Sequence, residues 1–157
     1  MKLTLDVENT VTKRDGKMHL DPFEPENSLT MVGVLTDQDV ERHFPFDHCD
    51  VPNQQHFYEQ VQWFLDEATI LICHNAAYDL MWLWESGFRY DGPVFDTMLA
   101  EYVLQRGIKE PLSLQACAER YELDTKKQDT LKEYFAKGYS TRDIPYNELC
   151  EYLSADL

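Results

Sequence analysis

Four carboxylates of the chain stand at positions where they could hold metal ions, and one phenol stands near the last of them. The first two are Asp6 and Glu8, two residues apart in the segment LTLDVEN. Side chains two apart on a β-strand project from the same face of the sheet, so both carboxylates could reach one cation. The alternative is a solvated pair without a ligand, since Asp-x-Glu is common at the end of an exposed strand.

The third carboxylate, Asp79, ends the motif HNAAYD, which follows the short apolar run TILIC. We interpret this run as a strand covered on both sides and the motif as the start of a helix. Open α/β sheets build their sites at the carboxyl ends of strands, so Asp79 is well placed for a site. The alternative is an acid that only interacts favourably with the helix dipole.

Tyr152 and Asp156 lie four residues apart near the end of the sequence. On a helix this separation puts both side chains on one face, so a hydroxyl and a carboxylate can point into the same cavity. The structural alternative is a tyrosine in the core beside an aspartate on the surface.

The four carboxylates indicate a metal site more strongly together than each does alone. If they meet in one cleft, they repel one another strongly unless cations lie between them. Oxygen ligands without His or Cys favour Mg²⁺ or Mn²⁺ over Zn²⁺. Two such ions about 4 Å apart can activate a water and stabilise the leaving oxygen of a phosphodiester. The chemistry predicted is therefore phosphodiester hydrolysis.

The elements that must position these residues are mainly strands in the first half of the chain and helices in the second. Apolar patterns predict strands at 2–7, 29–36, 41–47, 69–73 and 94–95. Capping residues and apolar stripes predict helices from Asn53 to 67, at 76–86 and 97–105, after Ser113, and from Pro145 onward. This order predicts an α/β fold in which helices flank a mixed sheet, with one domain over residues 1–157.

Length and composition also limit the classes of protein to which the chain can belong. At 157 residues and 43% apolar content, the chain is expected to form a folded globule. No apolar run approaches the roughly 18 residues that cross a bilayer, and Asp6 and Glu8 stand where a signal peptide is apolar. We therefore expect a cytoplasmic protein that is neither secreted nor membrane-bound. Reduced, buried thiols are expected at the four cysteines, Cys49, Cys73, Cys117 and Cys150.

The net charge of −15, from 29 acidic and 14 basic residues, opposes nucleic-acid binding at long range. One interpretation is an acidic protein that never meets nucleic acid. The other is an acidic site that needs divalent cations and receives its substrate from a partner domain.

Three motifs in order resemble the DEDD superfamily of 3′-5′ exonucleases, in the subgroup with a tyrosine four residues before the last aspartate. These motifs are LDVENT at 5–10, HNAAYD at 74–79 and YLSAD at 152–156. The segments FDTMLAEY at 95–102 and LSL at 112–114 are also similar to proofreading domains of family A DNA polymerases, bacterial and phage. The resemblance spans nearly the whole chain.

This resemblance implies a ribonuclease-H-like fold with a five-stranded sheet and two Mg²⁺ (or Mn²⁺) ions. Asp6 would bridge both ions, and Glu8 and Asp156 would complete one site. Asp79 would hold the second ion, mostly through water. Tyr152 would orient the attacking water, and a neutral phenol is not expected to be the base.

Substrate contacts are implied for Asn9, Thr10, Asn75 and Tyr78, with the Tyr78 ring offering a face to a base. Many relatives carry threonine where this chain has Asn9. The chain therefore departs from the family pattern at this substrate contact. By contrast, we expect structural roles for His74 and Asp96. The stripe of Met81, Trp82 and Trp84 is expected to pack its helix onto the sheet.

The resemblance further implies the release of nucleoside 5′-monophosphates from the 3′ end of single-stranded DNA, in a bacterial or phage-infected cell. Because the sequence ends one residue after Asp156, we expect the N-terminal part of a longer DNA polymerase, whose following domain is the partner that grips the DNA. Two alternatives stay open: an exoribonuclease like ribonuclease D, and a nucleic-acid-binding module of the same fold without turnover.

Overall fold

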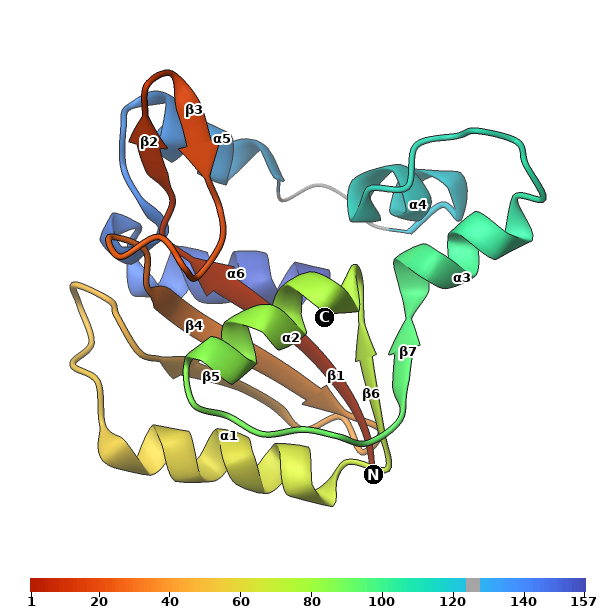
Figure 1. The fold of residues 1–157 in the computed structure, drawn as a ribbon, viewed down its shortest axis with the longest axis horizontal. Coiled ribbons are helices and arrows are strands. Elements are labelled where there is room, and N and C mark those ends of the chain that lie inside the picture. Colours follow the sequence, from red (N-terminus) through yellow and green to blue (C-terminus); the bar gives the residue numbers. More distant parts are fainter. Residues whose placement is uncertain (124–127) are drawn as a thin grey trace.

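A mixed five-stranded sheet forms the centre of the molecule, with strand order β5-β4-β1-β6-β7 (Figure 1). The computed structural model describes residues 1–123 and 128–157. The strands of this sheet are β1 (Lys2–Asn9), β4 (Leu29–Thr36), β5 (Glu41–Pro45), β6 (Ile70–Cys73) and β7 (Val94–Asp96). β4 pairs antiparallel with β1 and β5, whereas β6 pairs parallel with β1 and β7. The predicted α/β fold with a mixed sheet is confirmed.

Helices cover both faces of this sheet (Figure 1). The helices in the described residues are α1 (Gln55–Glu67), α2 (Ala76–Glu85), α3 (Thr97–Leu104), α4 (Leu114–Arg120), α5 (Gln128–Ala136) and α6 (Tyr146–Asp156), with a 3-10 turn η1 (Thr141–Asp143). The expected cap at Asn53 is wrong: the residue before α1 is Gln54, in an extended conformation and without a side-chain cap. None of the helices in the described part of the chain is both long and apolar enough to span a membrane.

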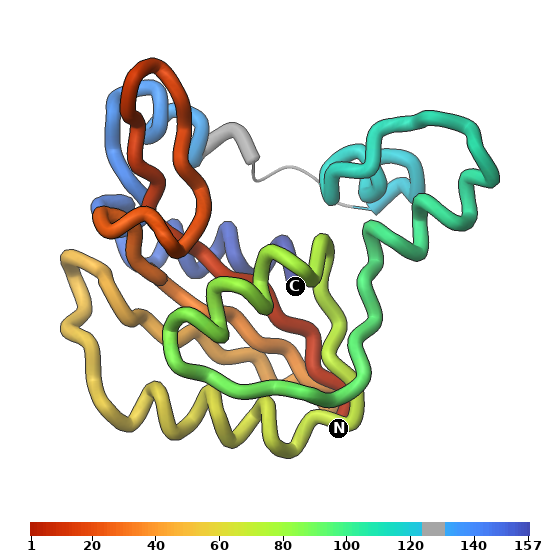
Figure 2. The backbone as a smooth tube through the Cα atoms, in the orientation of Figure 1, coloured from red at the N-terminus to blue at the C-terminus, as the bar shows by residue number. Residues whose placement is uncertain are grey.

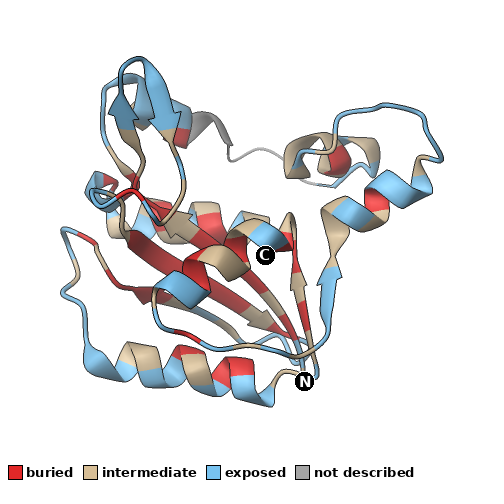
Figure 3. Cartoon of the chain, viewed as in Figure 1, coloured by how far each residue is buried: buried red, intermediate tan, exposed pale blue. Residues whose placement is uncertain are grey.

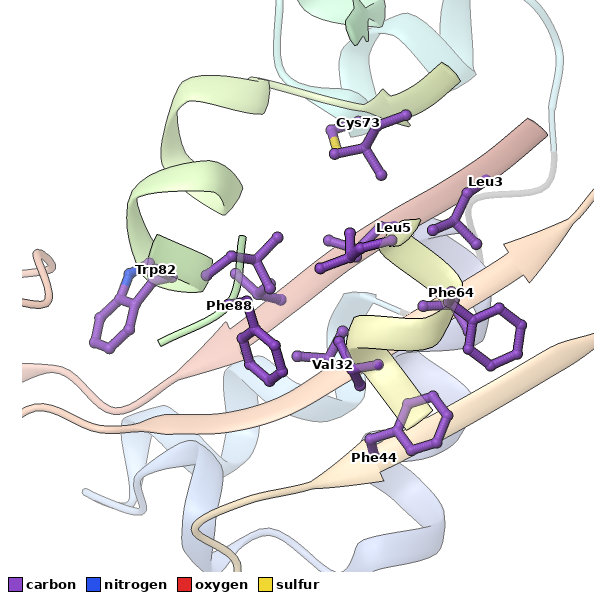
Figure 4. Packing of buried hydrophobic residues seen from close by; sticks show 14 of the residues in the cluster. Leu3, Leu5, Val32, Phe44, Phe64, Cys73, Trp82 and Phe88 are labelled. Atoms are coloured by element: carbon purple, nitrogen blue, oxygen red, sulfur yellow. The ribbon is translucent and has the colours of Figure 1, made fainter. Parts of the chain in front are cut away.

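Alternation along β1 divides the core into two layers. Leu3 and Leu5 point into the larger layer, which α1 and α2 cover (Figure 4). Val7 belongs to the same cluster. Residues on the other side of the sheet, including Met31 of β4, pack against α5 and α6. Because successive strand residues face opposite sides, Asp6 and Glu8 point toward the α6 layer. The strand pattern thus sets the face on which a site can form.

Several burial expectations need correction. Trp82 is buried in the core, but Trp84 is 48% exposed on the outer face of α2, so the expected stripe is too wide. Ile70 and Ile72 of β6 are only half-buried, so this strand is not covered on both sides as a continuous apolar run suggested. All four cysteines are free, and Cys49 is exposed instead of buried.

A small hairpin stands between β1 and β4, where no strand was predicted. It comprises β2 (Thr12–Arg14) and β3 (Lys17–His19), joined by Asp15 and Gly16. Both turn residues have positive φ, 52° and 76°, which an Asp-Gly pair tolerates and which suits a tight hairpin. The hairpin rises beside α5, whereas α3 and α4 stand at the opposite side of the molecule (Figure 2). Its tip is largely exposed (Figure 3).

Candidate metal centre

Three of the predicted carboxylates meet on the α6 side of the sheet. One carboxylate oxygen from each of Asp6, Glu8 and Asp156 lies within 4.8 Å of the other two. Asp6 and Glu8 come from the same face of β1, and Asp156 comes from the last turn of α6. Residues separated by about 150 positions in sequence therefore form one acidic cluster.

Close packing of α6 on the sheet depends on Gly33, to which sequence reasoning assigned no role. Gly33 lies opposite Asp6 in the β1–β4 pair. A Cβ atom at this position would lie 2.6 Å from Cγ and 2.8 Å from Cδ2 of Leu153 in α6. The signal in the sequence was a lone glycine inside an otherwise apolar strand, which often marks the close approach of another element.

Asp79 lies near Asp6 but is not one of the three carboxylates whose oxygens lie within 4.8 Å of one another. The parallel pairing of β6 with β1 runs as far as Ile72 with Thr4, and β6 ends at Cys73. β1 continues beyond this point to Asn9, so α2 can begin alongside its carboxyl-terminal half. Asp79 lies in the first turn of α2, is 2% exposed, and its Oδ2 has no hydrogen-bond partner among the described residues.

Burial raises the pKa of every carboxylate in this group, and repulsion between carboxylates adds to the shift for Asp6, Glu8 and Asp79. The pKa of Asp6 rises to about 7 because of burial and then the charge of Asp156. The pKa of Asp79 rises to about 8 because of burial and then the charge of Asp6. Burial also raises the pKa of Glu8 well above its usual range, with added repulsion from Asp6, and raises the pKa of Asp156.

This donor set fits hard divalent cations. Three clustered carboxylates and the nearby Asp79, whose buried Oδ2 has no hydrogen-bond partner among the described residues, gain most from a positive charge placed among them. The group offers oxygen ligands, which suit Mg²⁺ or Mn²⁺. The charge of Asp6 raises the pKa of Glu8 and of Asp79, and the charge of Asp156 raises the pKa of Asp6, so Asp6 interacts with each of the other three carboxylates.

Tyr152 stands one helical turn before Asp156, and its hydroxyl interacts with that carboxylate. Burial raises the pKa of Tyr152 above the usual range, and the negative charge of Asp156 raises it further. The phenol is therefore neutral at physiological pH. It can donate or accept a hydrogen bond but is not a base.

A cavity of about 760 Å³ adjoins the acidic cluster, with Glu8 in its wall. Asn9 and Tyr78 also line it, and their side chains are hydrogen-bonded to each other: the Tyr78 hydroxyl donates to Oδ1 of Asn9 at 2.7 Å. The same hydroxyl lies 3.1 Å from the carbonyl oxygen of Leu20. Of the expected substrate residues, Asn9 and Tyr78 thus border open space next to a carboxylate.

Thr10 is turned inward. Its Oγ1 accepts a hydrogen bond from the backbone N–H of Ser28 at 2.8 Å, and only 6% of the residue is exposed. Asn75 adopts a left-handed conformation, with φ of 69°, immediately before α2. It therefore forms the bend between β6 and the helix that carries Asp79.

Asp96 fixes this bend and confirms the structural role predicted for it. Its carboxylate accepts hydrogen bonds from the N–H groups that open both α2 and α3, namely those of Asn75, Ala76, Met98 and Leu99, at 2.9–3.2 Å. One negative charge thus caps two helix N-termini.

His74 is likewise structural, as expected. Its Nδ1 lies 2.9 Å from Oγ1 of Thr97, and its Nε2 lies 2.8 Å from the carbonyl oxygen of Leu112. Both ring nitrogens are occupied, so the imidazole ties the end of β6 to the segment before α4.

A family model described as 3′-5′ exonuclease matches residues 18–157, a segment that includes Asp79, Tyr152 and Asp156 and follows Asp6 and Glu8. No curated protein matches the chain.

Among solved structures, the chain is similar to one described as "apo form of the nuclease", with a TM-score of 0.64 and 19% identity, over 99% of this chain and 65% of that one. It is also similar to Brucella melitensis NrnC bound to pGG, with a TM-score of 0.65 and 19% identity, over 99% of this chain and 66% of that one. The chain thus spans slightly less than two thirds of each structure. At this identity the likeness shows a shared fold.

Proposed function

Because the chain belongs to the 3′-5′ exonuclease family, we propose that it hydrolyses the terminal phosphodiester bond at the 3′ end of single-stranded DNA and releases nucleoside 5′-monophosphates. The observation that carries this proposal is the cluster of Asp6, Glu8 and Asp156, with carboxylate oxygens within 4.8 Å, beside the buried Asp79.

Two divalent ions, Mg²⁺ or Mn²⁺, would be held by these four carboxylates. Asp6, Glu8 and Asp156 would hold one ion, and Asp6 with Asp79 would hold the other. When bound, such a pair lowers the pKa of a water and stabilises charge on the leaving oxygen. The unpartnered Oδ2 of Asp79 supports its assignment as a ligand.

The remaining residues would orient the reactants. Tyr152 keeps a neutral hydroxyl next to Asp156, where it can hold a water by hydrogen bonding. Asn9 and Tyr78 line the cavity beside Glu8, so we assign them to the terminal nucleotide. Asn75 and Thr10 would act mainly through the backbone geometry around α2 and β1, given their conformation and burial.

The test is cleavage of a single strand labelled at its 5′ end, in the presence of Mg²⁺ or Mn²⁺. A ladder of products shortened from the 3′ end is expected, with mononucleotides as the other product. Asp6→Ala should abolish it, while Glu85→Gln, which alters an exposed acid on α2, should leave it intact. A wild-type protein that binds the strand without shortening it would instead support the non-catalytic module.

The proposal also names the type of nucleic acid that is cleaved. The similarity of residues 95–102 to family A proofreading domains supports DNA and a covalently linked polymerase domain as the partner. A second candidate, an exonuclease for RNA or short oligonucleotides, is supported by the fold shared with NrnC bound to pGG. Rates on DNA and RNA strands of matched sequence and length separate the two, because these strands differ in the 2′-hydroxyl.

A further inference from the structure

The β2–β3 hairpin concentrates positive charge in a strongly acidic chain. Lys13, Arg14 and Lys17 fall within the segment KRDGK, whereas the whole chain has 14 basic and 29 acidic residues. A phosphodiester strand that approaches four carboxylates needs compensating cations along its path. The hairpin stands next to the cavity that Glu8 borders, so its basic side chains lie on such a path.

One face of the hairpin makes structural contacts with the loop that follows it. Cross-strand neighbours share a face and successive residues alternate, so Thr12 and Arg14 lie on one face. Thr12 donates a hydrogen bond to Oδ1 of Asn27 at 2.8 Å, and Arg14 forms an ion pair with Glu24 at 2.7 Å. These contacts brace the hairpin against the following loop and neutralise the charge of Arg14.

The other face presents a cation and an apolar side chain to the cavity. Lys13 and Met18 are directly opposite each other in the β2–β3 register, and both line the cavity. Met18 is 58% exposed, and no carboxylate of the described residues forms an ion pair with Lys13. The facing wall includes Phe135 and Tyr139 from the end of α5 and the turn after it.

We propose that Lys13 and Met18 contact the nucleic-acid strand on the 5′ side of the scissile bond, with the Lys13 ammonium on a backbone phosphate and Met18 against a base or sugar. This inference rests on the proposed exonuclease function and deepens it. The cavity is continuous with Glu8, so a strand whose 3′ end lies at the carboxylates passes the hairpin next. Since neither contact reads base edges, the grip is independent of sequence.

Kinetics on two substrate lengths test this proposal. A dinucleotide has a single phosphodiester, the scissile one, whereas a strand of about eight nucleotides extends past the hairpin. Lys13→Ala should raise KM for the longer strand by about 3- to 10-fold and leave kcat unchanged. It should also reduce the slope of log(kcat/KM) against the logarithm of the salt concentration by about 0.7. It should leave dinucleotide cleavage unchanged. Met18→Ala should also raise KM only for the longer strand.

The matched control is Lys2→Ala, which removes the same charge from an exposed position at the other end of β1, about 20 Å from Glu8 by strand length. If Lys13→Ala behaves like Lys2→Ala on the longer strand, or weakens dinucleotide cleavage equally, the proposed contact is wrong. Binding measured by fluorescence anisotropy in an Asp6→Asn background provides a readout without turnover. Weaker binding of the strand when Lys13→Ala is added to Asp6→Asn would support the contact. If the wild-type protein cleaves neither substrate, that failure would overturn the proposed function but not the contact.

Discussion

Gly33 and Asp6 are directly opposite each other in the antiparallel pair of β4 and β1. The glycine carries no chemistry, yet it leaves room for Leu153 of α6, three residues before Asp156. The position of the last carboxylate therefore depends on the absence of a side chain across the sheet from the first.

Gly33→Ala should damage both stability and activity. Its new Cβ would meet Leu153 at 2.6 Å, which forces α6 outward and costs about 1–3 kcal/mol by overpacking. We expect kcat to fall further than the loss of folded protein explains, because Asp156 moves with α6. Urea unfolding and kinetics on the double variant Gly33→Ala/Leu153→Ala provide the check: if the smaller residue 153 restores nothing, close packing is not the cause.

Metal binding should stabilise the folded protein through the four carboxylates. Adding Mg²⁺ or Mn²⁺ at about 100 times its dissociation constant is expected to increase the free energy of unfolding by about 2.7 kcal/mol. Asp6→Asn and Asp79→Asn should reduce this increase, while Glu85→Gln should retain it. Thermal unfolding with and without metal measures the effect, and an equal metal response in all four proteins would contradict the assigned ligands.

Without metal, stability should fall as pH rises. The folded pKa values of Asp6 and Asp79, about 7 and about 8, lie above the unfolded value of 3.8, so the folded state holds protons that the unfolded state has lost. This contribution is fully present below about pH 4 and is lost as pH rises through the folded values. Unfolding by urea at pH 5.5 and pH 8.5 should differ in free energy by about 5 kcal/mol, roughly 2 from Asp6 and roughly 3 from Asp79, and Asp6→Asn should reduce this difference.

Tyr152→Phe should lower kcat and leave metal-induced stabilisation nearly unchanged. The variant loses a neutral hydroxyl that interacts with Asp156 but keeps all four carboxylates. Because the pKa of Tyr152 is raised above its usual range, wild type and variant should share the same pH profile between pH 6 and 9. An ionisation between pH 6 and 9 that is present in the wild-type profile and missing from the variant would contradict a neutral phenol.

Asp96→Ala should lower the free energy of unfolding by more than the loss of one helix cap would. Its carboxylate accepts hydrogen bonds at the start of both α2 and α3, and each cap contributes about 1 kcal/mol. We expect a loss of about 2–3 kcal/mol, measured by urea unfolding, and reduced activity because α2 carries Asp79. The exposed Asp91→Ala is the control; equal losses in the two variants would exclude the double cap.

Local pattern alone determined much of this protein. Alternation in LTLDVEN placed Asp6 and Glu8 on one strand face, and the four-residue spacing placed Tyr152 and Asp156 on one helix, because these periods are properties of the backbone. The mixed sheet followed from the order of strands and helices. The structural roles of His74 and Asp96 were also predictable from their motifs.

Only the tertiary structure decided how these pieces meet. Gly33 allows α6 to pack closely on the sheet, and the start of α2 after β6 places Asp79 near Asp6. The hairpin with Lys13 came from a segment too short and polar to show a strand period. Distances between elements depend on packing among residues far apart in sequence, and such contacts leave no periodic trace in the chain itself.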